Sequence, residues 1–148
     1  MWEDDGLSER ARQGLSEYLS GQDWDCWFTA TSSKKLRYPR QAIGMVLESV
    51  HSTAKGFVGA ERHYLGGWHA HGLIKFNSDT TSIHHSMEQS EVISSSRLLE
   101  IQLSRRGYNR VESIRNPESV ANYVSKYITK NLDSDWEIWG LRSWNQKT

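Results

Sequence analysis

Hydrophobic positions in the first third of the chain predict a helix, a strand and a second helix. Leucines at positions 7, 15 and 19, followed by Gly21, predict a helix over residues 7–19 that ends at this glycine. Aromatic and β-branched residues at positions 24–31 predict the first strand. A polar, basic loop then leads to Pro39, which is suited to open a helix over residues 40–51.

The middle of the chain predicts a β-hairpin. Residues 56–63 and residues 68–76 both have the composition of strands, and the Gly66-Gly67 pair between them supplies a turn. Because the connection is short, we expect the two strands to be antiparallel neighbours in one sheet.

Beyond this hairpin the pattern predicts one more helix and two more strands. Residues 81–89 are compatible with a helix, whereas residues 97–104 alternate as a strand does. Residues 105–109 are typical of a glycine-containing turn, which leads into a short strand over residues 110–114.

Residues 116–119 have the pattern of a helix start. They supply an asparagine cap, a proline at the first helical position and an acid in the first turn, where the helix dipole favours negative charge. We expect this helix to run to about residue 131. The tail that follows contains Trp136, Trp139 and Trp144, which we expect to pack back on the domain or to become ordered with a partner.

The order of these elements predicts an α+β fold. A central antiparallel β-sheet would carry helices on its outer face, as in ferredoxin-like and RNA-recognition-module sandwiches, and would expose the other face to a ligand. A chain of 148 residues is the size of one domain, here with an N-terminal helical extension (1–23) and a Trp-rich C-terminal tail (132–148). The chain has no apolar run of membrane-spanning length and begins with acidic residues, so we expect a cytoplasmic protein.

Charge is balanced over the whole chain but segregated along it. Eighteen basic and eighteen acidic residues cancel, which argues against a protein that coats nucleic acid in bulk. Acids dominate residues 1–25 and bases dominate residues 97–130, as expected if one surface meets phosphates. The expected phosphate contacts form two clusters: Lys34, Lys35, Arg37 and Arg40 after the first strand, and Arg105, Arg106 and Arg110 at the later turn. Exposed tryptophans could stack on unpaired bases.

Two histidines on the second strand of the hairpin indicate a metal site. Side chains alternate along a strand, so His69 and His71 project from one face. The neighbouring strand brings Glu61 and His63 beside them, and we predict Glu61 as the third ligand, with His63 as the alternative. Two imidazoles and a carboxylate suit Mg²⁺ or Mn²⁺ that also holds a phosphate oxygen, and zinc would bind the same ligands. The single cysteine excludes a cysteine-based zinc site and an internal disulfide.

Two tyrosines on the last predicted helix indicate nucleophilic chemistry. Tyr123 and Tyr127 are one helical turn apart, about 5–6 Å between their Cβ atoms, and point to the same side. The simpler interpretation is an aromatic stripe that packs on the sheet, but Lys126 and Lys130 flank it, and ammonium groups are rarely buried. A phenol needs a cation or base to act as a nucleophile near neutral pH. Together with the metal site, the pattern favours attack by tyrosine on a phosphodiester.

These motifs resemble those of the HUH endonuclease superfamily. The resemblance rests on Phe28-Thr29-Ala30-Thr31, on Trp68-His69-Ala70-His71-Gly72-Leu73-Ile74, and on the run from Tyr123 to Lys130, in that order along the chain. The two-tyrosine helix is most similar to the rolling-circle replication initiators of small single-stranded-DNA phages of the microvirus type. The resemblance covers roughly residues 26–131.

The resemblance implies a replication initiator that nicks single-stranded origin DNA, next to a hairpin. It would form a 5′-phosphotyrosine link, leave a 3′ hydroxyl for a host polymerase, and rejoin strands later, acting as a monomer in the cytoplasm of a bacterial host with any helicase supplied separately. His69, His71 and Glu61 would bind the metal. Tyr123 and Tyr127 would be alternating nucleophiles with Lys126 and Lys130 as their partners, and Tyr123 is slightly preferred if only one acts.

Three other interpretations stay open. A single-tyrosine transposase or relaxase would share the metal and the nucleophile but act on other DNA sites. A non-enzymatic single-strand-binding module of the same fold would use the aromatic residues for stacking and would need no metal. A histidine-dependent phosphoesterase of small substrates would use the tyrosines only structurally.

Overall fold

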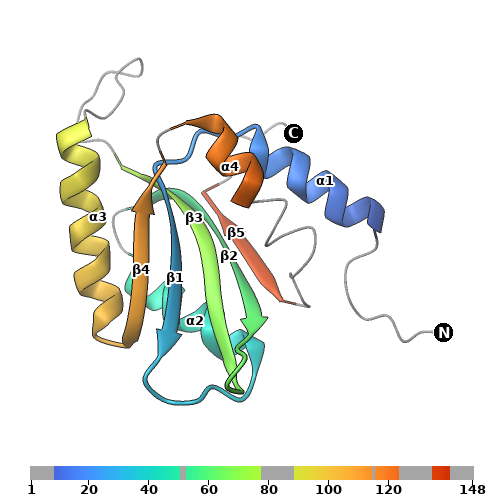
Figure 1. Ribbon diagram of the computed structural model, residues 1–148, viewed down its shortest axis with the longest axis vertical. Coiled ribbons are helices and arrows are strands. Elements are labelled where there is room, and N and C mark those ends of the chain that lie inside the picture. Colours follow the sequence, from blue (N-terminus) through green and yellow to red (C-terminus); the bar gives the residue numbers. More distant parts are fainter. Residues whose placement is uncertain (1–8, 51–52, 78–88, 115, 124–134, 141–148) are drawn as a thin grey trace.

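The computed structural model describes residues 9–50, 53–77, 89–114, 116–123 and 135–140. In chain order the elements of this part are α1 (Glu9–Ser20), β1 (Cys26–Ser32), α2 (Pro39–Ser49), β2 (Thr53–Arg62), β3 (Trp68–Phe76), α3 (Gln89–Ser104), β4 (Gly107–Ser113), α4 (Pro117–Tyr123) and β5 (Trp136–Trp139) (Figure 1). The predicted α+β class, an antiparallel sheet with helices packed on it, is confirmed.

The five strands form one antiparallel sheet in the order β4-β1-β3-β2-β5. β3, which carries the histidine pair, is the central strand. The hairpin of β2 and β3 is as predicted, with the pairings of Glu61 to His69 and Gly59 to His71. Gly59 also pairs with Trp136 of β5, so the last strand lies next to the hairpin.

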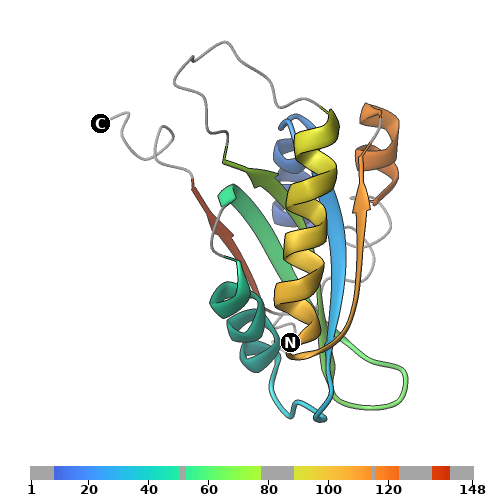
Figure 2. The same ribbon diagram turned by 90° about the vertical axis from the view of Figure 1, so that its left-hand side faces the viewer.

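Helices cover both faces of the sheet (Figure 2). On one face α2 and α3 bury a core that includes Phe28, Ile74 and Leu103. On the other face α1 and α4 pack on a second cluster that includes Phe57 and Leu73. The expectation of one fully open face was therefore wrong, because the end of that face near Phe57 and Leu73 is apolar and needs a cover.

The prediction of a strand over residues 97–104 was also wrong, since these residues belong to α3. The alternation of apolar and polar residues suggested a strand, but the buried side chains in this segment are spaced four residues apart, as on one face of a helix. Leu99 and Leu103, four residues apart, are 2% and 1% exposed, whereas Leu98 and Ile101 are 47% and 55% exposed. Of the helix predicted over residues 81–89, all but Gln89 lies outside the described residues.

Local signals place the other elements close to their predicted positions. α1 ends where the N–H of Gly21 donates to the carbonyls of Glu17 and Tyr18. α2 begins at Pro39. α4 begins at Pro117 as predicted and is described to Tyr123, and its predicted continuation to residue 131 lies outside the described residues.

The tryptophan tail packs on the sheet in its described part. Trp136 and Trp139 are the ends of β5. The Trp139 ring covers Gly56, where a Cβ atom would lie only 2.1 Å from it, and the indole N–H donates to Thr53 at 3.0 Å. Trp144 lies outside the described residues. No helix in the described part of the chain is both long and apolar enough to cross a membrane.

Candidate metal centre

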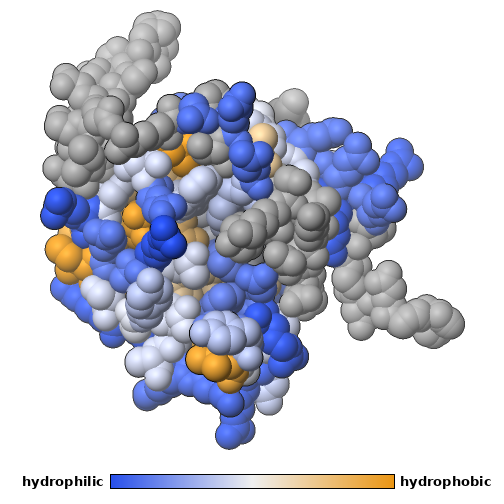
Figure 3. Space-filling view, viewed as in Figure 1, coloured by the Kyte–Doolittle hydropathy of each residue, from blue (hydrophilic) through white to orange (hydrophobic). Residues whose placement is uncertain are grey.

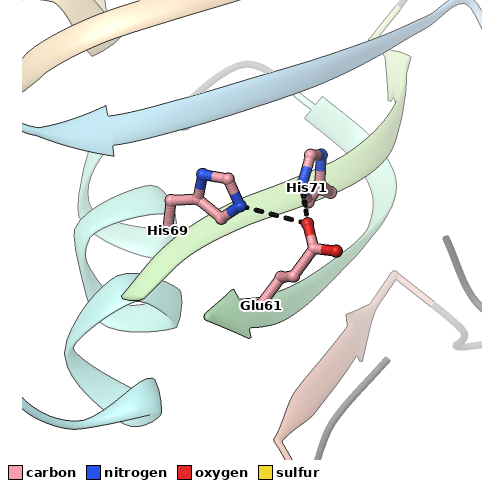
Figure 4. Close-up of side chains that lie close together, drawn as sticks. All are labelled: Glu61, His69 and His71. Atoms are coloured by element: carbon pink, nitrogen blue, oxygen red, sulfur yellow. Dashed lines mark hydrogen bonds and ion pairs between the residues drawn. The ribbon is translucent and has the colours of Figure 1, made fainter. Parts of the chain in front are cut away.

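Two neighbouring strands place three possible metal ligands on one face of the sheet. Glu61 of β2 pairs with His69 of β3, and His71 follows His69 at the next position on the same face. Figure 4 shows the three side chains converging above the hairpin. The predicted ligand set is therefore brought together by the register of a single hairpin.

One carboxylate oxygen connects the two imidazoles. Oε1 of Glu61 lies 3.0 Å from Nε2 of His69 and 2.5 Å from Nε2 of His71. The three ligand atoms all lie within 4.8 Å of one another. Adjacent ligands of an octahedral ion with bonds of about 2.1 Å lie about 3.0 Å apart, and the two oxygen-to-nitrogen distances are of this order. The residues can bind a metal.

The centre is partly buried and its carboxylate is ionised. The side chains of His69, His71 and Glu61 are 15%, 10% and 22% exposed. Burial raises the pKa of Glu61, but the hydrogen bonds from His69 and His71 outweigh it and lower this pKa to about 2. A negatively charged oxygen therefore lies between two imidazoles over the whole neutral range, which is the charge state that a cation requires.

Thr29 supports the centre from the neighbouring strand. Its hydroxyl lies 3.1 Å from Nδ1 of His71, while Nε2 of the same ring contacts Glu61. This hydrogen bond fixes the orientation of the ring, as partners of metal-binding histidines do. No individual role was predicted for Thr29, although it lies in the first of the three resembling motifs. Nδ1 of His69, by contrast, is buried and has no hydrogen-bond partner among the described residues.

His63 is not part of the ligand group. It follows the last residue of β2, and its Nδ1 accepts the backbone N–H of Leu65 at 3.1 Å. Its ring meets that of His69 edge to face, with 4.9 Å between the centroids. Of the two residues considered for the third ligand, Glu61 is the one whose oxygen lies beside both imidazoles.

Tyr123 lies on the same face but is packed. It is 6% exposed and stacks on Trp27, with ring centroids 5.2 Å apart. On β1, Thr29 pairs with His71, and Trp27 is the next residue along the strand whose side chain points to the same face. The stack of Tyr123 on Trp27 therefore lies next to His71 on this face. The aromatic packing weighed as the simpler interpretation is thus what Tyr123 adopts here. Tyr127, Lys126 and Lys130 lie outside the described residues.

Trp27 is itself held in place by β4. Its indole N–H donates to Glu112 at 2.7 Å, and Glu112 pairs with Arg110 at 2.8 Å. Neither Trp27 nor Glu112 was predicted as part of the site. The only sequence signal for Trp27 was its alternation with Thr29 and Thr31 along the strand, and such alternation is equally typical of a strand without a functional site.

The predicted phosphate contacts differ in their surroundings. Lys34, Lys35, Arg37 and Arg105 are exposed. Three arginines make ion pairs with acids: Arg40 with Glu137, Arg106 with Glu48, and Arg110 with Glu112. Of these seven residues, Arg110 is placed by register on the face of the metal centre, because it pairs with Thr29.

No protein-family model matches this chain, and a search of curated proteins found no match.

Proposed function

We propose that this protein is a metal-dependent, tyrosine-using endonuclease that nicks and rejoins single-stranded DNA, as expected of an HUH-type replication initiator. The observation that carries the proposal is the convergence of Glu61, His69 and His71 on one face of the sheet. Tyr123 packs on the same face, against Trp27, which is the same-face neighbour of the His71 partner Thr29. A divalent cation on these ligands would polarise a bound phosphodiester and offset its developing charge.

The chain's own residues would supply the nucleophile. The phenol loses its proton, its oxygen forms a bond to phosphorus, and the bond from phosphorus to the 3′ oxygen breaks. That oxygen takes up a proton and leaves as a 3′ hydroxyl. The reverse reaction rejoins the strand, since the phosphodiester energy is kept in the phosphotyrosine. Lys126 and Lys130 would stabilise the phenolate or the phosphate charge.

The proposed role of Tyr127 rests on its spacing of four residues from Tyr123 and on the resemblance to two-tyrosine initiators, because Tyr127 lies outside the described residues. The described residue that carries the nucleophile proposal is Tyr123, which is stacked on Trp27 of β1.

The burial of Tyr123 means that this residue can act as a nucleophile only after it moves. Its hydroxyl is enclosed and its ring is stacked, so it must leave Trp27 before it can attack a phosphate. If both tyrosines alternate as nucleophiles, this rearrangement is part of the cycle. If Tyr123 stays packed, Tyr127 acts alone.

A covalent-adduct assay with end-labelled DNA tests the proposal. The protein is incubated with Mn²⁺ or Mg²⁺ and a pool of randomised single-stranded oligonucleotides, because the target sequence is unknown. A tyrosine that takes the 5′ phosphate retains a label at the 3′ end but not at the 5′ end. We expect a denaturation-resistant, 3′-labelled protein band that disappears in EDTA and in His69→Ala. Absence of the band with every metal contradicts the proposal.

Single and double tyrosine variants then identify the nucleophile. Tyr123→Phe and Tyr127→Phe should each lower strand transfer, and the double variant should form no adduct, while Tyr18→Phe in α1 is the control. A Tyr127→Phe variant with full cleavage and transfer would instead favour a single-tyrosine transposase or relaxase.

A second candidate follows from the burial of Tyr123. If both tyrosines are structural, the same ligands could activate water in a phosphoesterase. That activity would survive replacement of both tyrosines by phenylalanine, and it would hydrolyse a small phosphodiester to a phosphomonoester and an alcohol without forming a protein–DNA band.

A further inference from the structure

Four aromatic rings form a continuous row from the metal centre to the tip of the β2–β3 hairpin. His71 and His69 meet with 4.7 Å between centroids, His69 and His63 with 4.9 Å, and His63 and Tyr64 with 4.8 Å. The first two contacts are edge to face, whereas His63 and Tyr64 are stacked with an interplanar angle of 24°. The row ends at Tyr64, which is 88% exposed.

The turn that carries Tyr64 is well defined. The N–H of His63 donates to Gly67 at 2.8 Å, and the N–H of Gly66 donates back to His63 at 2.9 Å. The His63 ring accepts the N–H of Leu65. Gly66 and Gly67 have φ angles of 96° and 81°, which side chains disfavour. The exposed ring is therefore presented on a fixed turn, which lowers the entropy cost of using it for binding.

A basic loop packs against the same turn through Lys35. Lys35 packs against it, because a Cβ atom at Gly67 would lie 2.8 Å from its Cγ and one at Gly66 would lie 3.1 Å from its Nζ. Lys34 and Arg37 are exposed in the same loop. Figure 3 shows a small hydrophobic patch at this end of the molecule with hydrophilic residues around it. An exposed ring beside cations is the combination with which proteins bind single-stranded nucleic acid.

We propose that Tyr64 is a stacking platform for one base of single-stranded DNA, and that Lys35 contacts a backbone phosphate beside that base. The proposal rests on the proposed function for its substrate class. The row of rings links this platform to the candidate ligands, so a strand stacked on Tyr64 can run along the hairpin towards the metal centre. Stacking on a ring face discriminates little between bases, so the platform gives affinity and register without sequence specificity.

Binding measurements without metal separate this proposal from catalysis. Fluorescence anisotropy of dye-labelled oligo(dT) is recorded in EDTA, where no cleavage occurs. Tyr64→Ala should bind about 5- to 100-fold more weakly, whereas Tyr64→Phe and Tyr64→Trp should stay within about two-fold of the unchanged protein. Leu65→Ala is the matched control: it is the next residue of the turn, 69% exposed, and has no aromatic ring. Lys35→Ala should make affinity less dependent on salt, so that the negative slope of log affinity against log salt becomes shallower by about one.

Abasic sites locate the stacked base. A series of oligonucleotides is used, each of which lacks the base of one nucleotide. Tyr64→Ala should weaken the binding of every oligonucleotide in the series except the one that lacks the stacked base, because there the platform has no base to bind and the two changes are not additive. Equal affinities of Tyr64→Ala and the unchanged protein would overturn the platform while leaving the nuclease proposal intact. A Tyr64 effect without any covalent adduct would support the platform and overturn the nuclease. No binding of oligo(dT) by the unchanged protein would overturn both.

Discussion

The hydroxyl of Thr29 lies 3.1 Å from Nδ1 of His71, on the side of the ring opposite to Glu61. His71 is thereby held at both nitrogens, by β1 on one side and by β2 on the other. Such a ring has little freedom to rotate, so Nε2 keeps its direction towards the point where the other two ligands meet.

Loss of the Thr29 hydroxyl should weaken metal binding. Thr29→Val keeps the shape of the side chain but leaves Nδ1 of His71 without this partner, and partners of this kind are typically worth about 10- to 100-fold in metal affinity. We expect Mn²⁺ affinity, measured by isothermal titration calorimetry, to fall by at least about 10-fold. Thr31→Val on the same strand is the control, and equal affinities of the two variants would rule out an orienting role for Thr29.

Acid should destabilise the metal-free protein through Glu61. The folded-state pKa of about 2 lies below the ordinary value of 4.5, so the carboxylate contributes stability that is present above about pH 4.5. This contribution, at most about 3 kcal/mol, is lost as the pH falls towards 2. Urea unfolding in EDTA should show a decline between pH 5 and pH 2 that is smaller in Glu61→Gln. Parallel declines would show that Glu61 does not contribute.

A methyl group at position 72 should disrupt the sheet beneath the metal centre. A Cβ atom at Gly72 would lie 2.2 Å from the carbonyl oxygen of Phe57 and 2.4 Å from the Phe28 ring. Both neighbours are buried and one is backbone, so Gly72→Ala should cost about 2–4 kcal/mol in the free energy of unfolding.

The control for this change lies in α1. A Cβ atom at Gly14 has nothing within 4 Å, so Gly14→Ala should leave stability unchanged or raise it by about 0.5–1 kcal/mol. Urea denaturation of both variants measures the difference, and similar stabilities would contradict the close packing at Gly72.

The single cysteine should be inert in the folded protein. Cys26 is fully buried in the core, and burial raises the pKa of its thiol. Reaction with a disulfide reagent should be at least about 100-fold slower in buffer than in concentrated urea, since it requires opening of the core. Rapid labelling of the folded protein would show that β1 opens locally.

The hairpin and its ligands were predictable because their signals are local. A glycine pair between two strand-like runs fixes the register, and the register alone brings Glu61 opposite His69. Glu61 was preferred over His63 because a carboxylate beside two imidazoles suits a divalent cation, and the structure groups Glu61 with His69 and His71.

The remaining features depend on distant contacts. Residues 97–104 alternate like a strand, and only packing against the sheet shows that Leu99 and Leu103 define a helical face. The cover of α1 and α4 over Phe57 and Leu73 joins segments far apart in the sequence, as does the stack of Tyr123 on Trp27. A helical spacing of two tyrosines says nothing about which ring finds an aromatic neighbour on the sheet.

The strand order has a consequence for how the protein folds. The central hairpin can form early from adjacent residues, but both strands at the sheet edges pair with partners far away in the sequence, β4 with β1 and β5 with β2. Such non-local pairings slow folding, typically to milliseconds or longer. During synthesis the histidines emerge well before β5, so the nascent chain carries its candidate metal ligands before the last strand can pair with β2.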